Sequence, residues 1–173
     1  MNGRSVLVAG IGNIFLGDDA FGVEVVRRLS RREIPDGVQV VDYGIRGFDL
    51  VYALMGEQDA TILVDAMARG GKPGTLYTLE PDSNDAGEGV AASVAIETHG
   101  MNPMNVLAMV RAMGGEPRRV LVVGCEPKSL DPSEEGEEGE MGLLALSPEV
   151  ESAVDEAVSM VESLVGEIRG MHG

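Results

Sequence analysis

A glycine-rich loop that ends in two carboxylates, Gly10–Asp19, constrains this chain more than any other stretch. It follows a short apolar run, residues 5–9, and precedes an apolar-periodic segment that starts near Ala20. This order predicts a strand, a glycine loop and a helix, which together form the first half of a βαβ unit. Loops of this kind commonly bind phosphate, because free backbone N–H groups and the helix dipole favour an anion there.

The loop nevertheless departs from both familiar phosphate-binding patterns. Phe15 stands where the G-x-G-x-x-G fingerprint has its third glycine. Gly12 and Gly17 have P-loop spacing, but Asp18 and Asp19 occupy the positions of the lysine and the Ser/Thr. Two carboxylates repel a phosphate and attract a cation, so the loop predicts a site for a metal or a cationic group. One aspartate suffices to cap the following helix, which leaves the second without a structural explanation.

Length and charge bound the possible functions. The chain has 173 residues, which predicts one domain, residues 1–173, with a sizeable core. A formal net charge of −16 argues against nucleic acid or an anionic membrane surface as a partner. There is no apolar run long enough to span a membrane, no signal-peptide pattern at the amino terminus and a single cysteine, so we expect a cytoplasmic protein.

Apolar runs and periodic segments alternate along the chain. This alternation predicts an α/β fold with three layers, in which a twisted, mostly parallel sheet of about five strands has helices on both faces. We expect strands at 4–9, 38–41, 60–64, 75–79 (an edge strand) and 119–123, and helices at about 20–32, 48–55, 102–113 and 148–168. Ser147 and Pro148 are typical of a helix start. Residues 90–96 fit either a strand or irregular structure, and the acidic insert at about 129–142 predicts a solvated, mobile loop.

The polar residues of interest follow the predicted strands. In a parallel sheet, ligands bind beyond the carboxyl ends of the strands. Asp42 ends the second strand, Asp65 ends the third, His99 precedes the helix before the last strand, and Cys125 with Glu126 follows the last strand. All of these residues, together with Asp18 and Asp19, should therefore lie at one edge of the sheet.

Carboxylates and an imidazole on separate loops are suitable ligands for Ni or Zn. His99 stands beside Gly100 at a helix start, which is an unusual place for a core histidine, and this favours a ligand role. Cys125 is either a nucleophile or a small buried filler, and we favour the filler because no base is adjacent in sequence. A serine hydrolase is poorly supported, because the chain has no Gly-x-Ser-x-Gly motif.

Taken together, these motifs resemble those of the hydrogenase maturation endopeptidases. The resemblance spans nearly the whole chain, in order and at suitable spacing, and rests on Gly10-Ile-Gly-Asn13, Gly17-Asp-Asp19-x-x-Gly22, Asp42-Tyr-Gly-Ile-Arg-Gly47, Val64-Asp65-Ala66, His99-Gly100 and Gly124-Cys-Glu-Pro127. The family removes a C-terminal peptide from the large subunit of [NiFe] hydrogenase after nickel insertion. Its fold, a twisted sheet with helices on both faces, is the one expected above.

The resemblance also implies residue roles. The family's three metal ligands fall on Asp19, Asp65 and His99, and its additional acidic residue falls on Asp42. It therefore implies that nickel arrives with the large-subunit precursor, that other divalent metals can occupy the site in the isolated protein, and that Asp19 and Asp42 are catalytic. The water that attacks the peptide bond would be activated by the metal or by a carboxylate such as Asp42. We accordingly expect Asp18 to cap the helix and Asp19 to bind metal.

Two other functions fit part of the pattern. A receiver-like signalling domain would use Asp18, Asp19 and Asp65 as a Mg²⁺ and phosphoryl-acceptor site. Against it, the acidic pair lies nine residues beyond Ala9, and Cys125-Glu126 replaces the lysine expected after the last strand. A metallohydrolase that acts on a small molecule is disfavoured, because the chain does not supply a complete metal shell of its own.

Overall fold

A computed structural model describes residues 3–81, 101–128 and 145–170. His99 and the acidic insert lie outside these residues. Within them, a five-stranded sheet has the order β2-β1-β3-β5-β4. Its strands are β1 (Val6–Ile11), β2 (Val38–Gly44), β3 (Ala60–Ala66), β4 (Leu76–Leu79) and β5 (Arg119–Cys125). β4 pairs antiparallel with β5 at one edge, and the other pairs are parallel.

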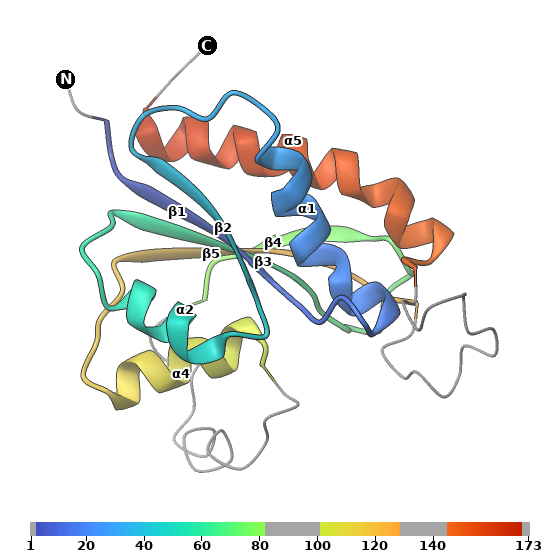
Figure 1. Ribbon diagram of the computed structural model, residues 1–173, viewed down its shortest axis with the longest axis horizontal. Helices are drawn as coiled ribbons and strands as arrows, with labels where there is room; N and C mark the ends of the chain where they lie inside the picture. The colour runs from blue at the N-terminus through green and yellow to red at the C-terminus, as the bar shows by residue number, and fades with distance from the viewer. Residues whose placement is uncertain (1–2, 82–100, 129–144, 171–173) are drawn as a thin grey trace.

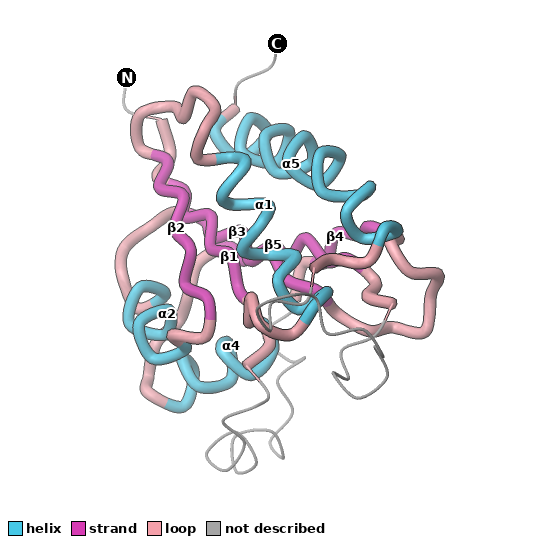
Figure 2. Tube along the Cα trace, turned by 45° about the vertical axis from the view of Figure 1, so that its right-hand side comes forward, coloured by secondary structure: helices cyan, strands magenta, loops and turns pink. Residues whose placement is uncertain are grey.

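Helices cover both faces of the sheet, as Figures 1 and 2 show. The helices α1 (Phe21–Leu29) and α5 (Pro148–Arg169) pack on one face, and α2 (Gly47–Leu54) and α4 (Pro103–Ala112) pack on the other. A 3-10 turn, η1 (Gly17–Ala20), leads into α1. The α/β fold with a mostly parallel sheet between two helical layers, expected from the sequence, is confirmed.

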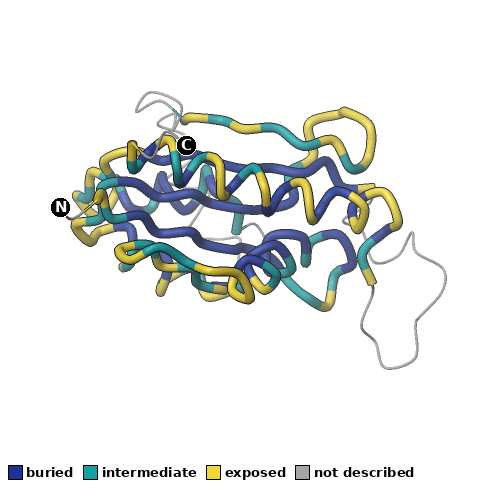
Figure 3. The backbone as a smooth tube through the Cα atoms, turned by 90° about the horizontal axis from the view of Figure 1, so that it is seen from above, coloured by how far each residue is buried: buried dark blue, intermediate teal, exposed yellow. Residues whose placement is uncertain are grey.

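The core consists of two apolar layers, one on each side of the sheet. β1, β3 and β5 are almost entirely buried, because both of their faces are covered, and this explains their continuous apolar sequences. Figure 3 shows these inner strands buried between helices whose outer sides are exposed. No helix among the described residues is long and apolar enough to cross a membrane.

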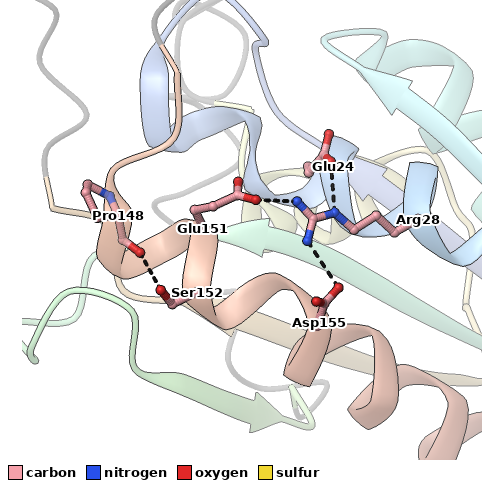
Figure 4. Close-up of polar contacts among 6 residues, drawn as sticks. All are labelled: Glu24, Arg28, Pro148, Glu151, Ser152 and Asp155. Atoms are coloured by element: carbon pink, nitrogen blue, oxygen red, sulfur yellow. Dashed lines mark hydrogen bonds and ion pairs between the residues drawn. The ribbon is translucent and has the colours of Figure 1, made fainter.

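An ion cluster connects the two helices of one face (Figure 4). The Arg28 guanidinium on α1 pairs with Glu24, one turn earlier, and with Glu151 and Asp155 on α5. These carboxylates raise the pKa of Arg28, the Glu151 hydrogen bond contributing most. The arrangement fixes the position of α5 against α1, and exposed pairs of this kind contribute only modestly to stability.

The observed strands extend further toward their carboxyl ends than expected. β1 continues to Ile11, β2 to Gly44, and β5 to Cys125, each two or three residues past the predicted end. The reason is that ladder pairing with a neighbouring strand continues through residues that are polar or glycine: Gly10 pairs with Asp42, and Asp65 pairs with Gly124. The sheet therefore includes the predicted site residues Asp42 and Asp65 in its strands.

Candidate active site

Close backbone packing brings the start of α1 against the end of β3 and folds the loop after β1 back on itself. A Cβ on Gly22 would lie 2.1 Å from the Val64 carbonyl oxygen, and a Cβ on Gly12 would lie 1.8 Å from the Asp19 carbonyl oxygen. Gly12 also has a φ of +146°, which side-chain-bearing residues rarely adopt. These glycines serve close approach rather than phosphate binding, and they bring Asp19 beside Asp65.

Asp19 lies on the 3-10 turn η1 and is partly buried. Its Oδ2 accepts a hydrogen bond from the Asn13 backbone N–H at 2.9 Å, which fixes the carboxylate against the glycine loop. Burial raises the pKa of Asp19, and the Asn13 hydrogen bond offsets only part of this effect. The site thus holds a carboxylate with few hydrogen-bond partners.

Asp65, near the end of β3, is only 2% exposed. Its Oδ1 is buried and accepts no hydrogen bond from the described residues. Burial raises the pKa of Asp65 well above its ordinary value, the nearby Asp19 charge raises it further, and the Ala66 backbone N–H lowers it in part. A buried carboxylate oxygen without a partner is costly to the fold, and a bound cation would relieve that cost.

Asp42 lies near the end of β2, the strand beside β1, and is exposed. It lines a hollow of about 300 Å³ together with Gly12–Phe15, Arg27 and the turn of residues 43–46. Arg46 donates a hydrogen bond from Nη2 to the Asp42 carbonyl oxygen at 2.5 Å. Neither Asp19 nor Asp65 lines this hollow, but Asn13, which binds Asp19, does. The hollow therefore adjoins the pair of carboxylates.

The expectation that Asp18 caps the following helix is wrong. Neither η1 nor α1 has a side-chain cap, and Asp18 is fully buried. Its carboxylate instead accepts hydrogen bonds from the Ser147 N–H at 2.7 Å, the Ser147 hydroxyl at 2.9 Å and the Lys128 N–H at 2.8 Å. For the same reason Ser147 stands at the N-cap position of α5 without capping it, although Pro148 does begin the helix as predicted.

Cys125 is buried, as expected of a packing residue. Burial raises the pKa of its thiol to about 12, and the Asp18 and Glu126 charges contribute. Cys125 is therefore a thiol at neutral pH and a poor nucleophile.

Glu126, whose sequence position did not indicate a role, is buried. Its carboxylate accepts hydrogen bonds from the backbone N–H groups of Arg69 and Gly70, and so orders the loop after Asp65. Its place at the end of β5 is visible in the sequence, but its partners are not.

His99 lies outside the described residues, so its predicted ligand role stays a prediction. Among residues 3–81, 101–128 and 145–170, no three or more His, Cys, Asp or Glu side chains are grouped as a metal-binding cluster. The described part of the chain thus supplies Asp19 and Asp65 as neighbours, with Asp42 at the adjoining hollow.

Comparison with known proteins identifies the family. The profile of HycI, hydrogenase maturation protease, matches residues 23–164. The chain belongs to the hydrogenase maturation protease family. It is therefore an endopeptidase of hydrogenase maturation, as the sequence motifs indicated, and the receiver-like alternative is wrong.

Individual relatives agree with this assignment. The chain is 32% identical to the hydrogenase 2 maturation protease of Escherichia coli K12 over 158 residues, 90% of this chain and 87% of that protein. It is 31% identical to a putative hydrogenase maturation protease of Methanocaldococcus jannaschii, over 98% and 99% of the two chains. Several other curated relatives are longer, and the chain spans 59–62% of their length.

A solved structure also matches the protease. It is the hydrogenase maturating endopeptidase HybD from E. coli, with a TM-score of 0.69 and 32% identity over 94% of this chain and 93% of that chain. The likeness in sequence and fold together extends over almost the whole of both proteins.

Proposed function

We propose that this protease removes the C-terminal peptide of a [NiFe] hydrogenase large-subunit precursor after nickel insertion. In this proposal Asp19, Asp65 and His99 bind the nickel that the precursor carries, and Asp42 lies where the peptide is cut. We also propose the cytoplasm as its compartment. The observation that carries the proposal is the buried Oδ1 of Asp65, which has no hydrogen-bond partner among the described residues and lies beside Asp19.

The donor atoms available at the sheet edge suit such a metal. Carboxylate oxygens combine with imidazole in sites for Ni and Zn, and other divalent ions can occupy such a site in the isolated protein. Asp19 and Asp65 approach each other despite their like charges, which is unfavourable unless a cation lies between them. An incomplete ligand set in the protease means that the precursor must supply the remaining ligands together with the metal.

The residues of the protease then have distinct tasks. Asp19 and Asp65 recognise the metal and hold the precursor so that its scissile bond lies over the adjoining hollow. Bound nickel would supply Lewis acidity to a water or to the scissile carbonyl. Asp42 is exposed to that hollow, and its carboxylate can accept a proton from the attacking water and return it to the leaving amine. Arg46 holds the Asp42 backbone in place.

The test is cleavage of purified nickel-loaded precursor, with the released peptide identified by mass spectrometry. Wild type should release the C-terminal peptide, and Asp19→Asn and Asp65→Asn should reduce kcat/KM at least about 100-fold, since each removes a charged ligand. Asp36→Asn, an exposed substitution in the turn before β2, is the matched control and should cleave like wild type. Unaltered cleavage by Asp65→Asn would refute the proposed site.

A further inference from the structure

An exposed apolar stripe runs from the hollow at Asp42 along the outer side of α2. Ile45, in the turn before the helix, is 68% exposed and lines the hollow. Phe48 and Tyr52 follow at 69% and 66% exposure, and Met55 is also exposed. Phe48, Tyr52 and Met55 are four and three residues apart, which places them along one side of α2, and Ile45 precedes them in the turn. Phe15 is 58% exposed and lines the hollow from the glycine loop.

This exposure is unusual for the chain. It has only three Phe and three Tyr and no Trp, yet two of the Phe and one Tyr lie exposed at the stripe or hollow. The opposite side of α2 already buries Leu50, Val51 and Leu54 against the sheet, so the exposed side is not needed for the core. Contiguous exposed apolar surface of this kind indicates an interaction site.

We propose that the stripe formed by Ile45, Phe48, Tyr52 and Met55 is the docking surface for the protein substrate, the large-subunit precursor. This inference rests on the proposed function and names the surface that binds the substrate. The stripe is continuous with the hollow that contains Asp42, because Ile45 belongs to both, and the proposed function places the scissile segment over that hollow. A second copy of this chain on the stripe would cover the same hollow and obstruct the substrate.

The charges around the hollow specify the occupant further. The chain carries a net charge of −16, but two guanidiniums, Arg27 and Arg46, line the hollow. Arg46 is engaged by Asp49 and the Asp42 carbonyl oxygen, whereas Arg27 is exposed and forms no ion pair within the described part of the chain. The docked segment is therefore apolar and carries a carboxylate that faces Arg27.

Steady-state cleavage of the nickel-loaded precursor and its direct binding by biolayer interferometry test the proposal. Phe48→Ser/Tyr52→Ser should raise KM and the dissociation constant about tenfold or more with kcat nearly unchanged, because exposed aromatic anchors contribute to binding and not to chemistry. Phe48→Leu/Tyr52→Phe keeps the apolar surface and should restore most of the affinity. Arg27→Glu should raise KM as well.

Glu156→Ser, an exposed substitution on α5 across the sheet, is the control and should behave like wild type. The docking proposal fails if the serine double variant binds the precursor as tightly as wild type, or if wild type does not bind it. It also fails if light scattering shows a dimer that the double variant abolishes. If Arg27→Glu leaves KM unchanged, the docked segment does not place a carboxylate against Arg27. Tight binding that needs the stripe, without any cleavage, would contradict the proposed function alone.

Discussion

Asp18 and Asp19 are sequence neighbours in opposite environments. Asp18 is fully buried and its two oxygens accept three hydrogen bonds, whereas Asp19 is partly exposed and accepts one from the backbone of Asn13. The first carboxylate is satisfied by the fold, and the second retains free acceptor capacity beside Asp65. The structure therefore supports a structural role for Asp18 and supports the proposed ligand role for Asp19.

Replacement of Asp18 should destabilise the protein. In Asp18→Asn, an amide NH₂ replaces one oxygen and faces the donors of Ser147 or Lys128, so at least one buried donor loses its acceptor. The expected loss in free energy of unfolding is about 2–3 kcal/mol. Urea denaturation measures it, with Asp36→Asn as the exposed control. Unchanged stability would show that these hydrogen bonds are dispensable.

Unlike Asp18, which stabilises the fold, Asp65 destabilises it when metal is absent. Its pKa is raised in the folded state from an ordinary value of 3.8, so over the range between the two pKa values the folded protein holds a proton that the unfolded chain has released. The free energy of unfolding therefore decreases as pH rises through this range. Burial of Asp65 therefore lowers the stability of the metal-free fold at pH values above the ordinary carboxyl pKa.

Asp65→Asn should accordingly be more stable than wild type at pH 7.5 in the presence of a chelator. The advantage should shrink as the pH falls and vanish below the ordinary carboxyl pKa of 3.8, because Asp65 in wild type is then neutral in both the folded and the unfolded state. Urea titrations at several pH values measure the difference. A wild type that is at least as stable as the variant across this range would contradict the burial argument.

At the scale of the elements, the sequence predicts every described strand and α-helix, but not the 3-10 turn η1. Long apolar runs identify β1, β3 and β5, and the periodic stripe identifies α5. What it cannot supply are contacts between distant segments. The partners of Asp18 are 110 and 129 positions away, so local capping preference favoured the wrong role. The unpaired Asp65 oxygen likewise depends on three-dimensional packing.

The contact between α1 and the strand ends depends on Gly22. A Cβ at this position would lie 2.1 Å from the Val64 carbonyl oxygen and 2.4 Å from the Ile11 carbonyl oxygen. Both oxygens belong to paired strands of the sheet, which cannot move away easily. Gly22→Ala should cost about 2–3 kcal/mol and lower the thermal midpoint by roughly 5–10 °C. Calorimetry measures the shift. Gly71→Ala is the matched control, because its Cβ would make only an ordinary 3.7 Å contact with Glu126. Equal midpoints for the two variants would contradict the close packing.

At the scale of the whole molecule, one edge of the sheet combines three features. The carboxylates of Asp19 and Asp65 lie beside each other, the hollow at Asp42 adjoins them, and the apolar stripe of α2 leads away from that hollow. The sequence predicted that Asp19, Asp42 and Asp65 share this edge, because the carboxyl ends of parallel strands meet there. The sequence did not indicate the stripe, since an apolar residue on a short helix is equally consistent with a buried position in the core.

We propose that the protease binds the metal of its substrate before it cuts the peptide bond. The most direct measurement compares the cleavage rate of nickel-loaded and nickel-free precursor by the same wild-type protein, without added metal. We expect rapid release of the C-terminal peptide from the loaded precursor and at least about 100-fold slower release from the nickel-free one, since Asp19 and Asp65 alone do not hold the scissile bond in place. Equal rates on the two precursors would contradict the claim and indicate a protease that acts independently of nickel.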